Sequence, residues 1–264
     1  MKMKDSVAIV TGGGNGIGEA VAKYFVRNGA KVAVVDIAQA NIDRVVKEIK
    51  AMGGEAIGVQ ANVSNEADTA KFIKATLDAF GKLNIVVACA GIIRDGTMLS
   101  LDKETGKVSK KMGLDKWQPV IDINLTGTFL TLRDGAEAMV NGGWEGLLVT
   151  ISSVNKAGQV GQLNYSSTKV ADALMPKIIV GEFQMRGIRN IRCVGIAPGY
   201  AATPMLTGMN QEALKGLLRD VHIGRLVQPE EIASLIGHCV ENGAINATTL
   251  EITGGLCYEH GIAK

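Results

Sequence analysis

The sequence predicts an α/β fold, a doubly wound parallel sheet of about seven strands with helices on both faces. Short apolar segments alternate along the chain with segments whose apolar residues recur at helical spacing. The apolar segments are rich in Val, Ile and Leu and lack a polar face, as strands covered on both sides do. No linker interrupts this alternation, so we predict one domain over residues 1–264.

The first half of the chain starts with a strand at 6–10. A helix follows, in which Ile17, Ala20, Val21, Tyr24 and Phe25 lie at helical spacing. Further strands are predicted at 31–36, 55–63 and 83–89, separated by helices around 42–52 and at 67–80. A helix between two strands is the usual crossover of a parallel sheet, and we expect each crossover to be right-handed.

The second half repeats the alternation. We predict a long helix at 117–139, a strand at 146–153, a helix at 166–184, a strand at 191–197, a helix at 229–241 and a last strand at 248–253. Two connections, 94–116 and 199–228, are longer than the others and follow strand ends. Long connections inside a compact domain are usually functional loops or lids, and open α/β sheets bind ligands beside strand ends.

Composition excludes several classes of protein. The chain is 47% hydrophobic and 20% charged with a net charge of +2, which is typical of a globular protein and gives no sign of nucleic-acid binding. No apolar stretch is long enough to span a membrane. The four cysteines form no CxxC pair and no secretory segment is visible, so we expect free thiols in the cytoplasm. The three histidines are scattered, so we expect no metal.

A glycine-rich turn follows the first strand and opens the first helix. It reads Thr11-Gly-Gly-Gly-Asn-Gly-Ile-Gly18, so Gly12, Gly16 and Gly18 recur in it. Glycine allows sharp turns and a close backbone approach, and a helix start presents free N–H groups to an anion. A Walker loop is excluded because the Gly-Lys-Ser/Thr ending is absent. The turn therefore predicts a pyrophosphate site.

The second predicted strand ends at Asp36. In a dinucleotide fold this carboxylate accepts hydrogen bonds from the adenosine ribose hydroxyls, and it would repel a 2′-phosphate. Neither Asn15 nor Ile37 supplies a positive charge that would attract that phosphate. We therefore predict NAD rather than NADP as the cofactor.

The candidate reacting groups lie in the second half. Ser152 and Ser153 end a predicted strand, and Tyr165 and Lys169 are four residues apart on one helix face. A free tyrosine has a pKa of about 10, and a neighbouring ammonium favours the phenolate, as acid/base work near neutral pH requires. A serine hydroxyl nearby can hold the substrate oxygen.

Together these residues resemble the short-chain dehydrogenase/reductase family over nearly the whole chain, which implies a Rossmann-type fold. Further matches are Asn62-Val63 at the adenine, Cys89-Ala90-Gly91 in the turn after the fourth strand, Asn124 in the catalytic tetrad, and Pro198-Gly199 with Thr203 at the nicotinamide carboxamide. The resemblance implies NAD-binding by Gly12, Asn15, Gly16, Ile17, Gly18, Asp36, Ile37, Asn62, Val63, Ala90, Gly91, Tyr165, Lys169, Pro198, Gly199 and Thr203.

The resemblance also implies roles. Tyr165 is expected to protonate a carbonyl oxygen or deprotonate an alcohol, and Ser153 to hydrogen-bond that oxygen. Lys169 is expected to bind the nicotinamide ribose and tune Tyr165, and Asn124 to hold a water in the proton path. The implied reaction is hydride transfer between nicotinamide and a small ketone or secondary alcohol.

Three residues depart from the family pattern. Cys89 replaces an asparagine, and Asn62 replaces an aspartate, so the adenine amino contact has to use its side-chain oxygen. The interval from Ser153 to Tyr165 is one residue shorter than usual, which leaves Ser152 as a second candidate for the substrate-binding serine. We prefer Ser153, because the second serine of such a pair normally has this role in the family.

Alternatives remain for the function. A 3-oxoacyl thioester (ACP/CoA) reductase is the second choice, because family members of that kind usually prefer NADP and Asp36 argues against NADP. A non-catalytic NAD-binding sensor is disfavoured by the complete tetrad, and an epimerase needs a larger substrate domain. The family also implies a homotetramer that pairs through helices near 117–140 and 164–186, with 250–262 at a second interface.

The substrate pocket is expected to be mostly apolar. Ile92, Ile93, Val154 and the 205–209 loop supply apolar residues near the site, and residues 200–220 are expected to close it. The polar segment 94–116 cannot bury much apolar area, so we expect an outer rim or a subunit contact there.

Overall fold

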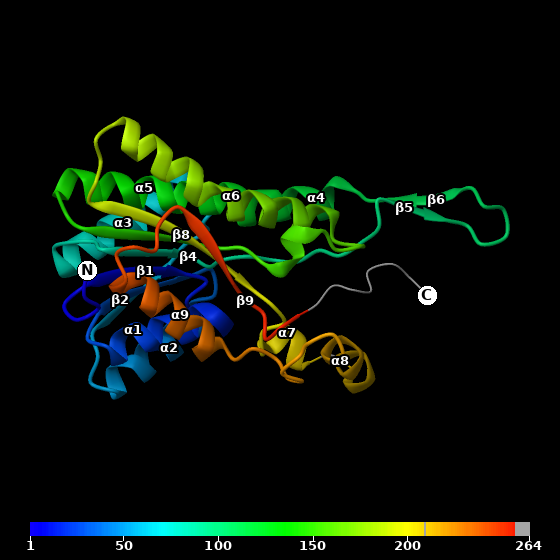
Figure 1. The fold of residues 1–264 in the computed structure, drawn as a ribbon, viewed down its shortest axis with the longest axis horizontal. Helices are drawn as coiled ribbons and strands as arrows, with labels where there is room; N and C mark the ends of the chain where they lie inside the picture. Colours follow the sequence, from blue (N-terminus) through cyan, green and yellow to red (C-terminus); the bar gives the residue numbers. More distant parts are fainter. Residues whose placement is uncertain (209, 257–264) are drawn as a thin grey trace.

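The computed structural model describes residues 1–208 and 210–256 and contains a seven-stranded parallel sheet (Figure 1). The strand order is β3-β2-β1-β4-β7-β8-β9, with β1 at the point where the order reverses. The predicted fold class is confirmed. The strands are β1 (Val7–Thr11), β2 (Lys31–Asp36), β3 (Ala56–Gln60), β4 (Ile85–Ala88), β7 (Gly146–Ile151), β8 (Ile191–Pro198) and β9 (Thr248–Ile252).

Helices cover both faces of the sheet (Figure 1). One layer holds α1 (Gly16–Arg27), α2 (Gln39–Ala51) and α9 (Pro229–Glu241). The other holds α3 (Glu66–Phe80), α5 (Gly127–Gly142) and α6 (Leu163–Met185). Alternate residues of one strand therefore enter two different apolar clusters: in β1, Ala8 and Val10 pack under the first layer and Ile9 under the second.

The long helix predicted at 117–139 is continuous but not uniform. It consists of α4 (Leu114–Val120), a π-helical stretch η1 (Ile121–Thr126) and α5. Pro119 lies just before the change of winding. Proline lacks the N–H that an α-helix needs at that position, and π-turns inside helices are frequent at functional sites. Asn124, a predicted site residue, lies in the π-helical stretch.

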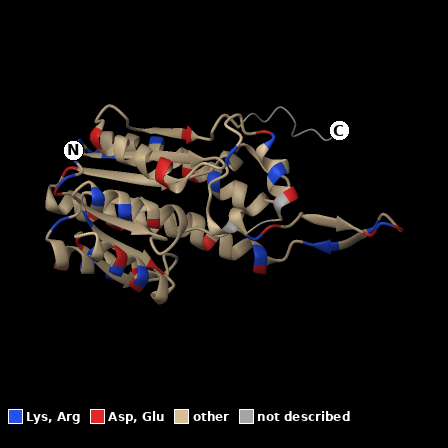
Figure 2. Ribbon diagram, turned by 90° about the horizontal axis from the view of Figure 1, so that it is seen from below, with Lys and Arg blue, Asp and Glu red and all other residues tan. Residues whose placement is uncertain are grey.

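The connection 94–116 contains a hairpin that the sequence analysis missed. Strands β5 (Leu99–Leu101) and β6 (Val108–Lys111) pair antiparallel and project away from the body of the molecule (Figures 1 and 2). Asp102 accepts hydrogen bonds from the backbone of Glu104 and Thr105, and Gly106 has φ 65°, so turn chemistry closes the tip. The strands are short and β6 ends in two lysines, and the segment therefore has the composition of a loop. We call residues 96–112 the arm.

The connection 199–228 also contains helices, α7 (Pro204–Thr207) and α8 (Gln211–Leu218). Residue 209 and residues 257–264 lie outside the described part of the chain, so the expectations for 205–209 and 250–262 are addressed only in part. Among the described ranges 1–208 and 210–256, none of the helices has the length and apolar character needed to cross a membrane.

Candidate active site

The predicted site residues gather at the carboxyl ends of the strands. Because β1 connects outward to β2 on one side and pairs with β4 on the other, the loops after β1 and β4 diverge there. Such a switch point is where open α/β sheets bind ligands. The loop after β1, the end of β2, the turn after β4 and the loops after β7 and β8 all face this edge.

The glycine-rich loop, residues 12–18, lies so close to neighbouring backbone atoms that side chains on Gly12 and Gly18 would collide with them. Gly12 has φ 64°, and a Cβ atom on it would lie 2.9 Å from the Ala90 Cα atom. A Cβ atom on Gly18 would collide with the Gly12 carbonyl oxygen. Asn15 caps α1 by accepting from the Gly16 backbone N–H at 2.8 Å. The loop thus forms a glycine cradle at a helix start, the geometry that accommodates a pyrophosphate.

The glycine-rich loop lies close to two other segments of the site, the turn after β4 and the loop after β8. The Thr11 hydroxyl accepts from the backbone N–H groups of Cys89, at 3.1 Å, and Ala90, at 3.3 Å. A Cβ atom on Gly16 would lie 3.3 Å from the Thr203 Cγ2 atom, so the loop after β8 closely approaches the phosphate loop. Residues predicted at opposite ends of a dinucleotide therefore line one continuous edge.

Asp36 lies at the end of this edge where the sequence predicts the adenosine. Its carboxylate accepts from the backbone N–H groups of Gly14 and Ala38, at 3.0 Å each. Arg44 of α2 donates to the Gly14 carbonyl oxygen at 2.9 Å and pairs with Glu19 at 2.6 Å. The cation that reaches this loop is thus already paired with an anion. Ile37 follows Asp36 and is exposed, so an apolar side chain is available beside the strand end.

Asn62 and Val63 are placed differently from each other. Asn62 is exposed, and its side-chain oxygen accepts from both the backbone N–H and the hydroxyl of Ser64, at 3.1 and 2.9 Å. An adenine amino group would have to displace one of these donors. Val63 is buried, and it packs so tightly against Gly127 of α5 that a Cβ atom there would collide with it.

The two serines after β7 are used differently. The Ser152 hydroxyl donates to the carbonyl oxygen of Lys169 at 2.6 Å and is 2% exposed. The Ser153 hydroxyl accepts from the Asn155 backbone N–H at 3.1 Å, at the start of the 3-10 helix η2 (Val154–Ala157). An accepting hydroxyl keeps its own proton available for another oxygen.

Tyr165 and Lys169 lie on one face of α6, as their spacing predicts. The Lys169 Nζ atom is 5.5 Å from the centroid of the Tyr165 ring. Lys169 is buried, and its ammonium donates to the Ile151 carbonyl oxygen at 2.7 Å and to Asp172 at 2.8 Å. Burial lowers the pKa of Lys169, but the negative charge of Asp172 and the Tyr165 side chain outweigh it, so the pKa is raised. Lys169 therefore remains an ammonium ion.

Asn124 binds the turn after β4. Its side-chain oxygen accepts from the Ile92 backbone N–H at 2.8 Å, and its amide donates to the Ile92 carbonyl oxygen at 3.0 Å. The backbone carbonyl oxygen of Asn124 accepts from the Thr128 hydroxyl at 2.7 Å. A Cβ atom on Gly91 would lie 3.4 Å from the Asn124 side-chain oxygen. Asn124 therefore positions Gly91 and Ile92, a role the sequence analysis did not anticipate.

The segment after β8 completes the site. Pro198 is the last residue of the strand, and Gly199 donates to the Ile252 carbonyl oxygen at 2.9 Å. A Cβ atom on Gly199 would lie 2.9 Å from the Thr253 Cα atom, so only glycine allows this approach. Thr203 is the N-cap residue of α7 and lies next to Gly16.

Sequence reasoning missed two buried polar residues of α6. Asn164 donates to the carbonyl oxygens of Arg94 and Lys116, at 3.0 and 2.9 Å, which attaches the start of the helix to both ends of the 94–116 connection. Asp172 is fully buried and pairs with Lys169. The signal for Asp172 was present, because positions 165, 169 and 172 follow the 4-3 spacing of one helix face.

The base of the arm contacts the segment that precedes Tyr165. Gly96 donates to the Gly161 carbonyl oxygen at 2.8 Å, and the Gln162 side chain donates to Asp95 at 3.0 Å. These contacts lie three to four residues before Tyr165. The rest of the arm projects into solvent (Figure 2).

The turn after β4 carries a thiol in place of the expected amide. Burial raises the pKa of the Cys89 thiol to about 12, against the positive charge of Lys169, which lowers it. Cys89 is therefore a neutral thiol at physiological pH and contributes no charge to the site.

Comparison with known proteins places these features in a family. The family model described as short chain dehydrogenase matches residues 6–214. A 3-oxoacyl-[acyl-carrier-protein] reductase of Synechocystis sp. is 38% identical over 95% of this chain and 96% of its own. A human (3R)-3-hydroxyacyl-CoA dehydrogenase is 33% identical over 97% of each chain. A short-chain type dehydrogenase/reductase structure from Mycobacterium marinum has TM-score 0.85 and 26% identity, covering 97% of this chain and 96% of that one.

Proposed function

The chain belongs to the short-chain dehydrogenase family and is an oxidoreductase acting on hydroxyl or carbonyl groups, and from this premise we propose that it interconverts 3-hydroxyacyl and 3-oxoacyl thioesters with NAD(H). The carrying observation is the convergence of the glycine cradle, Asp36, Ser153, Tyr165 and Lys169 on one sheet edge. A nicotinamide cofactor supplies or accepts the hydride.

The described residues fit such a cofactor. The glycine cradle leaves the space of missing side chains beside a helix start, where a pyrophosphate is stabilised by free N–H groups. Asp36 supports NAD, because its carboxylate faces the end where NADP carries a further phosphate, and Arg44 is already paired with Glu19. Gly199 and Thr203 would contact the nicotinamide end, next to Gly16.

The chain's own groups supply the proton chemistry. In the reducing direction the Tyr165 hydroxyl donates its proton to the substrate oxygen, and in the oxidising direction the phenolate takes it back. Ser153 donates a second hydrogen bond to the same oxygen, while Ser152 is occupied with the Lys169 carbonyl. Two of the three Lys169 N–H groups have partners, so one remains for a ribose hydroxyl.

The thioester substrate takes precedence over the small or cyclic ketone that the sequence analysis preferred. The argument against a thioester was Asp36, which concerns only the choice of cofactor. Full-length relatives named for 3-oxoacyl and 3-hydroxyacyl substrates favour a chain-bearing substrate. Ile92 and Ile93 are half-buried in the segment that Asn124 binds, and Val154 directly follows Ser153, so apolar side chains that suit an acyl chain lie beside the candidate catalytic residues.

The test is an absorbance assay of the purified chain. We expect NADH to form from NAD with a (3R)-3-hydroxyacyl-CoA and to be consumed with 3-oxoacyl-CoA. Turnover with simple secondary alcohols or cyclic ketones but with no thioester would contradict the proposed substrate and support a small or cyclic ketone instead. Binding of NAD without turnover of any carbonyl or alcohol would support the alternative of a non-catalytic NAD-binding sensor.

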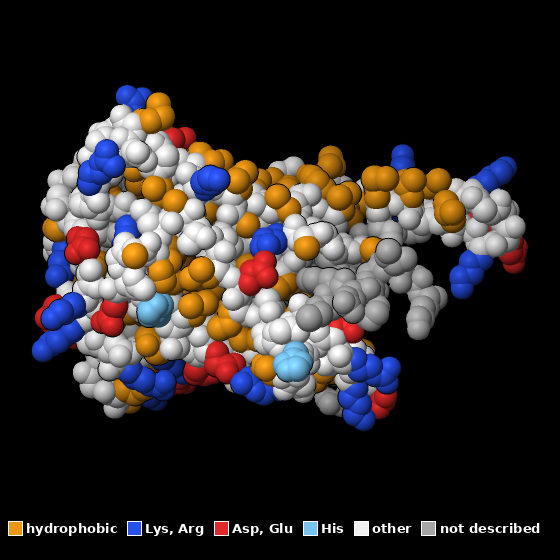
Figure 3. Space-filling model, in the orientation of Figure 1, with side chains coloured by type: hydrophobic (Ala, Val, Ile, Leu, Met, Phe, Trp, Pro, Cys, Tyr) orange, Lys and Arg blue, Asp and Glu red, His pale blue; other side chains and the backbone are white. Residues whose placement is uncertain are grey.

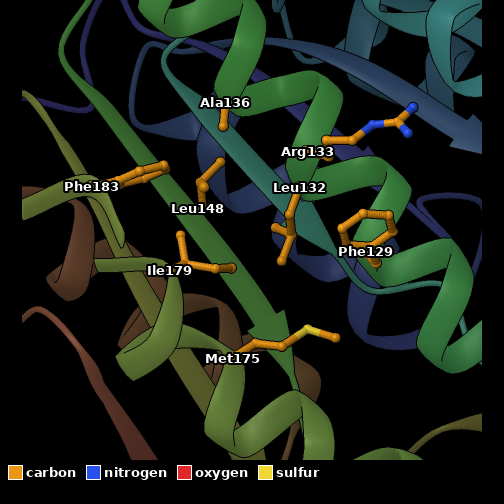
Figure 4. Close-up of a pocket in the computed structure, with 8 residues that line it drawn as sticks. All are labelled: Phe129, Leu132, Arg133, Ala136, Leu148, Met175, Ile179 and Phe183. Atoms are coloured by element: carbon orange, nitrogen blue, oxygen red, sulfur yellow. The ribbon is translucent and has the colours of Figure 1, made fainter. Parts of the chain in front are cut away.

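A homotetramer remains our proposal for the assembly. α6 exposes Val170, Leu174 and Ile178 at four-residue intervals, with about half of each side chain accessible. Figure 4 shows Met175, Ile179 and Phe183 of α6 facing Phe129, Leu132 and Ala136 of α5 across an apolar groove. Exposed hydrophobic side chains continue along the same edge of the molecule toward the arm (Figure 3). Contiguous apolar surface of this kind marks protein interfaces.

A further inference from the structure

Asp172 is a buried acid that neither the proposed reaction nor cofactor binding uses. Its side chain is 0% exposed. One carboxylate oxygen, Oδ2, accepts from the Lys169 ammonium at 2.8 Å, and the other, Oδ1, has no hydrogen-bond partner among the described residues. An ionised carboxylate is costly to bury, and a missing hydrogen bond adds to that cost. An apolar residue would cost less, so the position of this carboxylate requires an explanation.

The backbone around Asp172 is fixed independently of its side chain. The Thr150 hydroxyl donates to the Asp172 carbonyl oxygen at 2.8 Å, and the Thr249 hydroxyl donates to that of Ala173 at 2.7 Å. These bonds attach α6 to β7 and β9. The carboxylate is therefore not needed to dock the helix, and its evident partner is Lys169.

Lys169 is the group on which Tyr165 depends. Its ammonium lies 5.5 Å from the centroid of the Tyr165 ring, and its positive charge favours the phenolate. A negative charge 2.8 Å from that ammonium offsets much of this effect. Burial raises the pKa of Asp172, whereas the Lys169 ammonium opposes the rise. The same ion pair raises the pKa of Lys169 against burial.

Other charged groups on the packed elements have partners of their own. The Cys89 thiol after β4 also affects the pKa of Lys169. This thiol is neutral near neutral pH, because burial raises its pKa to about 12. Arg192 of β8 binds the Cys239 and Ile245 carbonyls, and Glu251 of β9 pairs with Lys156 of η2. Asp122 of η1 binds Gln118, Lys116 of α4 binds the Asp95 carbonyl, and Arg133 of α5 pairs with Asp134. Asp115 of α4 is exposed to solvent.

We propose that Asp172 is a positioning residue that holds Lys169 in place and offsets its charge, so that the Tyr165 phenol keeps its proton to a higher pH than Lys169 alone would allow. The inference rests on the proposed role of Tyr165 as acid and base. It favours the protonated phenol near neutral pH, the form that reduction of a carbonyl requires. Oxidation of an alcohol requires the phenolate and should therefore become faster at alkaline pH.

The direct test is a titration of Tyr165 that needs no substrate. Tyrosinate formation is followed by ultraviolet difference spectroscopy in the full-length wild type and in Asp172→Asn, each against the same protein carrying Tyr165→Phe. We expect the midpoint of Tyr165 to fall by about one pH unit or more in Asp172→Asn, because a negative charge beside the Lys169 ammonium is removed within several ångströms, while the Ile151 carbonyl still accepts from Lys169. A midpoint that rises would show that Asp172 instead serves to keep the buried Lys169 charged, and would overturn the proposal. Asp172→Leu is a second neutral variant and should shift the midpoint in the same direction.

The matched control is Asp134→Asn on α5. Asp134 is another buried acid, but it accepts from Thr69 and Arg133 instead of from the site. Its replacement should lower stability and leave the Tyr165 midpoint unchanged. An unchanged midpoint in a folded Asp172 variant, or an equal shift in Asp134→Asn, would overturn the proposal.

A second readout separates this proposal from the proposed function. If the wild type turns over a hydroxyacyl thioester, the rising limb of its oxidation rate against pH should move to lower pH in Asp172→Asn, in step with the spectroscopic midpoint. If no substrate is found, the titration still decides the role of Asp172. A limb that stays in place while stability falls would show that the acid has only a structural role.

Discussion

The Ser152 hydroxyl donates to the carbonyl oxygen of Lys169 at 2.6 Å, which binds the end of β7 to the face of α6 that carries Tyr165 and Lys169. The neighbouring Ser153 hydroxyl instead accepts from the Asn155 backbone. Two adjacent residues of the same type thus have separate tasks, and substitution can separate them.

Ser153→Ala is expected to lower kcat by about a hundredfold while leaving stability nearly unchanged, because it removes one donor to the reacting oxygen. Ser152→Ala is the matched control. It removes one of the hydrogen bonds to a buried helix carbonyl and should cost about 0.5–1.5 kcal/mol of unfolding free energy. Steady-state kinetics and urea unfolding measure the two effects. The opposite pattern, with Ser152→Ala inactive and Ser153→Ala active, would assign the substrate oxygen to Ser152.

Tyr165→Phe keeps the ring and removes the proton. We expect turnover to fall by about 10²–10⁴-fold, the range that general acid–base catalysis contributes, with NADH affinity largely retained. Stopped assays give the rate, and NADH fluorescence titration gives the affinity. Substantial activity in this variant would mean that another group moves the proton.

Asp36→Ala should reduce the preference for NAD over NADP, measured as the ratio of kcat/KM values. The substitution removes a negative charge from the place where a 2′-phosphate would lie, so we expect the ratio to fall by about tenfold or more. Asp43→Ala, which removes an exposed carboxylate of α2, serves as the control. Equal use of NADP and NAD by the wild type would contradict the prediction directly.

Replacing residues 99–111 with an Asn-Gly turn should preserve the chemical step. Met112 donates to the Met98 carbonyl oxygen at 2.9 Å, so a two-residue turn can join the ends. The contacts of Asp95 and Gly96 with Gln162 and Gly161 remain. We expect a modest change in KM or in tetramer stability, read by kinetics and light scattering. Loss of hydride transfer in a folded, NAD-binding variant would place the arm in the active site.

Cys89 makes stability fall at alkaline pH. Its pKa is raised by burial to about 12 in the folded chain, above the value of about 8.5 expected for an unfolded thiol. The folded state therefore holds the proton more tightly, and this contribution is present below about pH 8.5 and lost as pH rises toward the folded value. In urea unfolding, Cys89→Ala should lose less stability between neutral and alkaline pH than the wild type. An identical loss in both proteins would rule out this contribution.

The exposed apolar face of α6, formed by Val170, Leu174 and Ile178, is expected to be a subunit contact, which light scattering tests. Wild-type protein at micromolar concentration is expected to be a tetramer, and Leu174→Glu should dissociate it by placing a charge in the apolar contact. Lys177→Gln, one turn further along the helix, changes the net charge by the same single unit and is the control. A monomeric wild type would refute the assembly.

Local pattern was sufficient for much of this protein. Strand and helix positions follow from the spacing of apolar residues, and β2 and α9 have the predicted bounds, because hydrophobic periodicity is a property of short segments. The glycine-rich loop and the Tyr165–Lys169 pair were also visible in the sequence, since backbone conformation and helix spacing are set within a few residues.

Contacts between distant segments decided the rest. The pairing of Asn124 with Ile92, the attachment of Asn164 to Arg94 and Lys116, and the close packing of Val63 on Gly127 all join residues that sequence spacing does not relate. That the Ser152 hydroxyl, and not that of Ser153, binds a carbonyl of α6 also depends on the docking of that helix. The burial of Asp172 beside Lys169 followed from the docking of that helix on β7 and β9, because a carboxylate is exposed or desolvated only according to what the fold places over it.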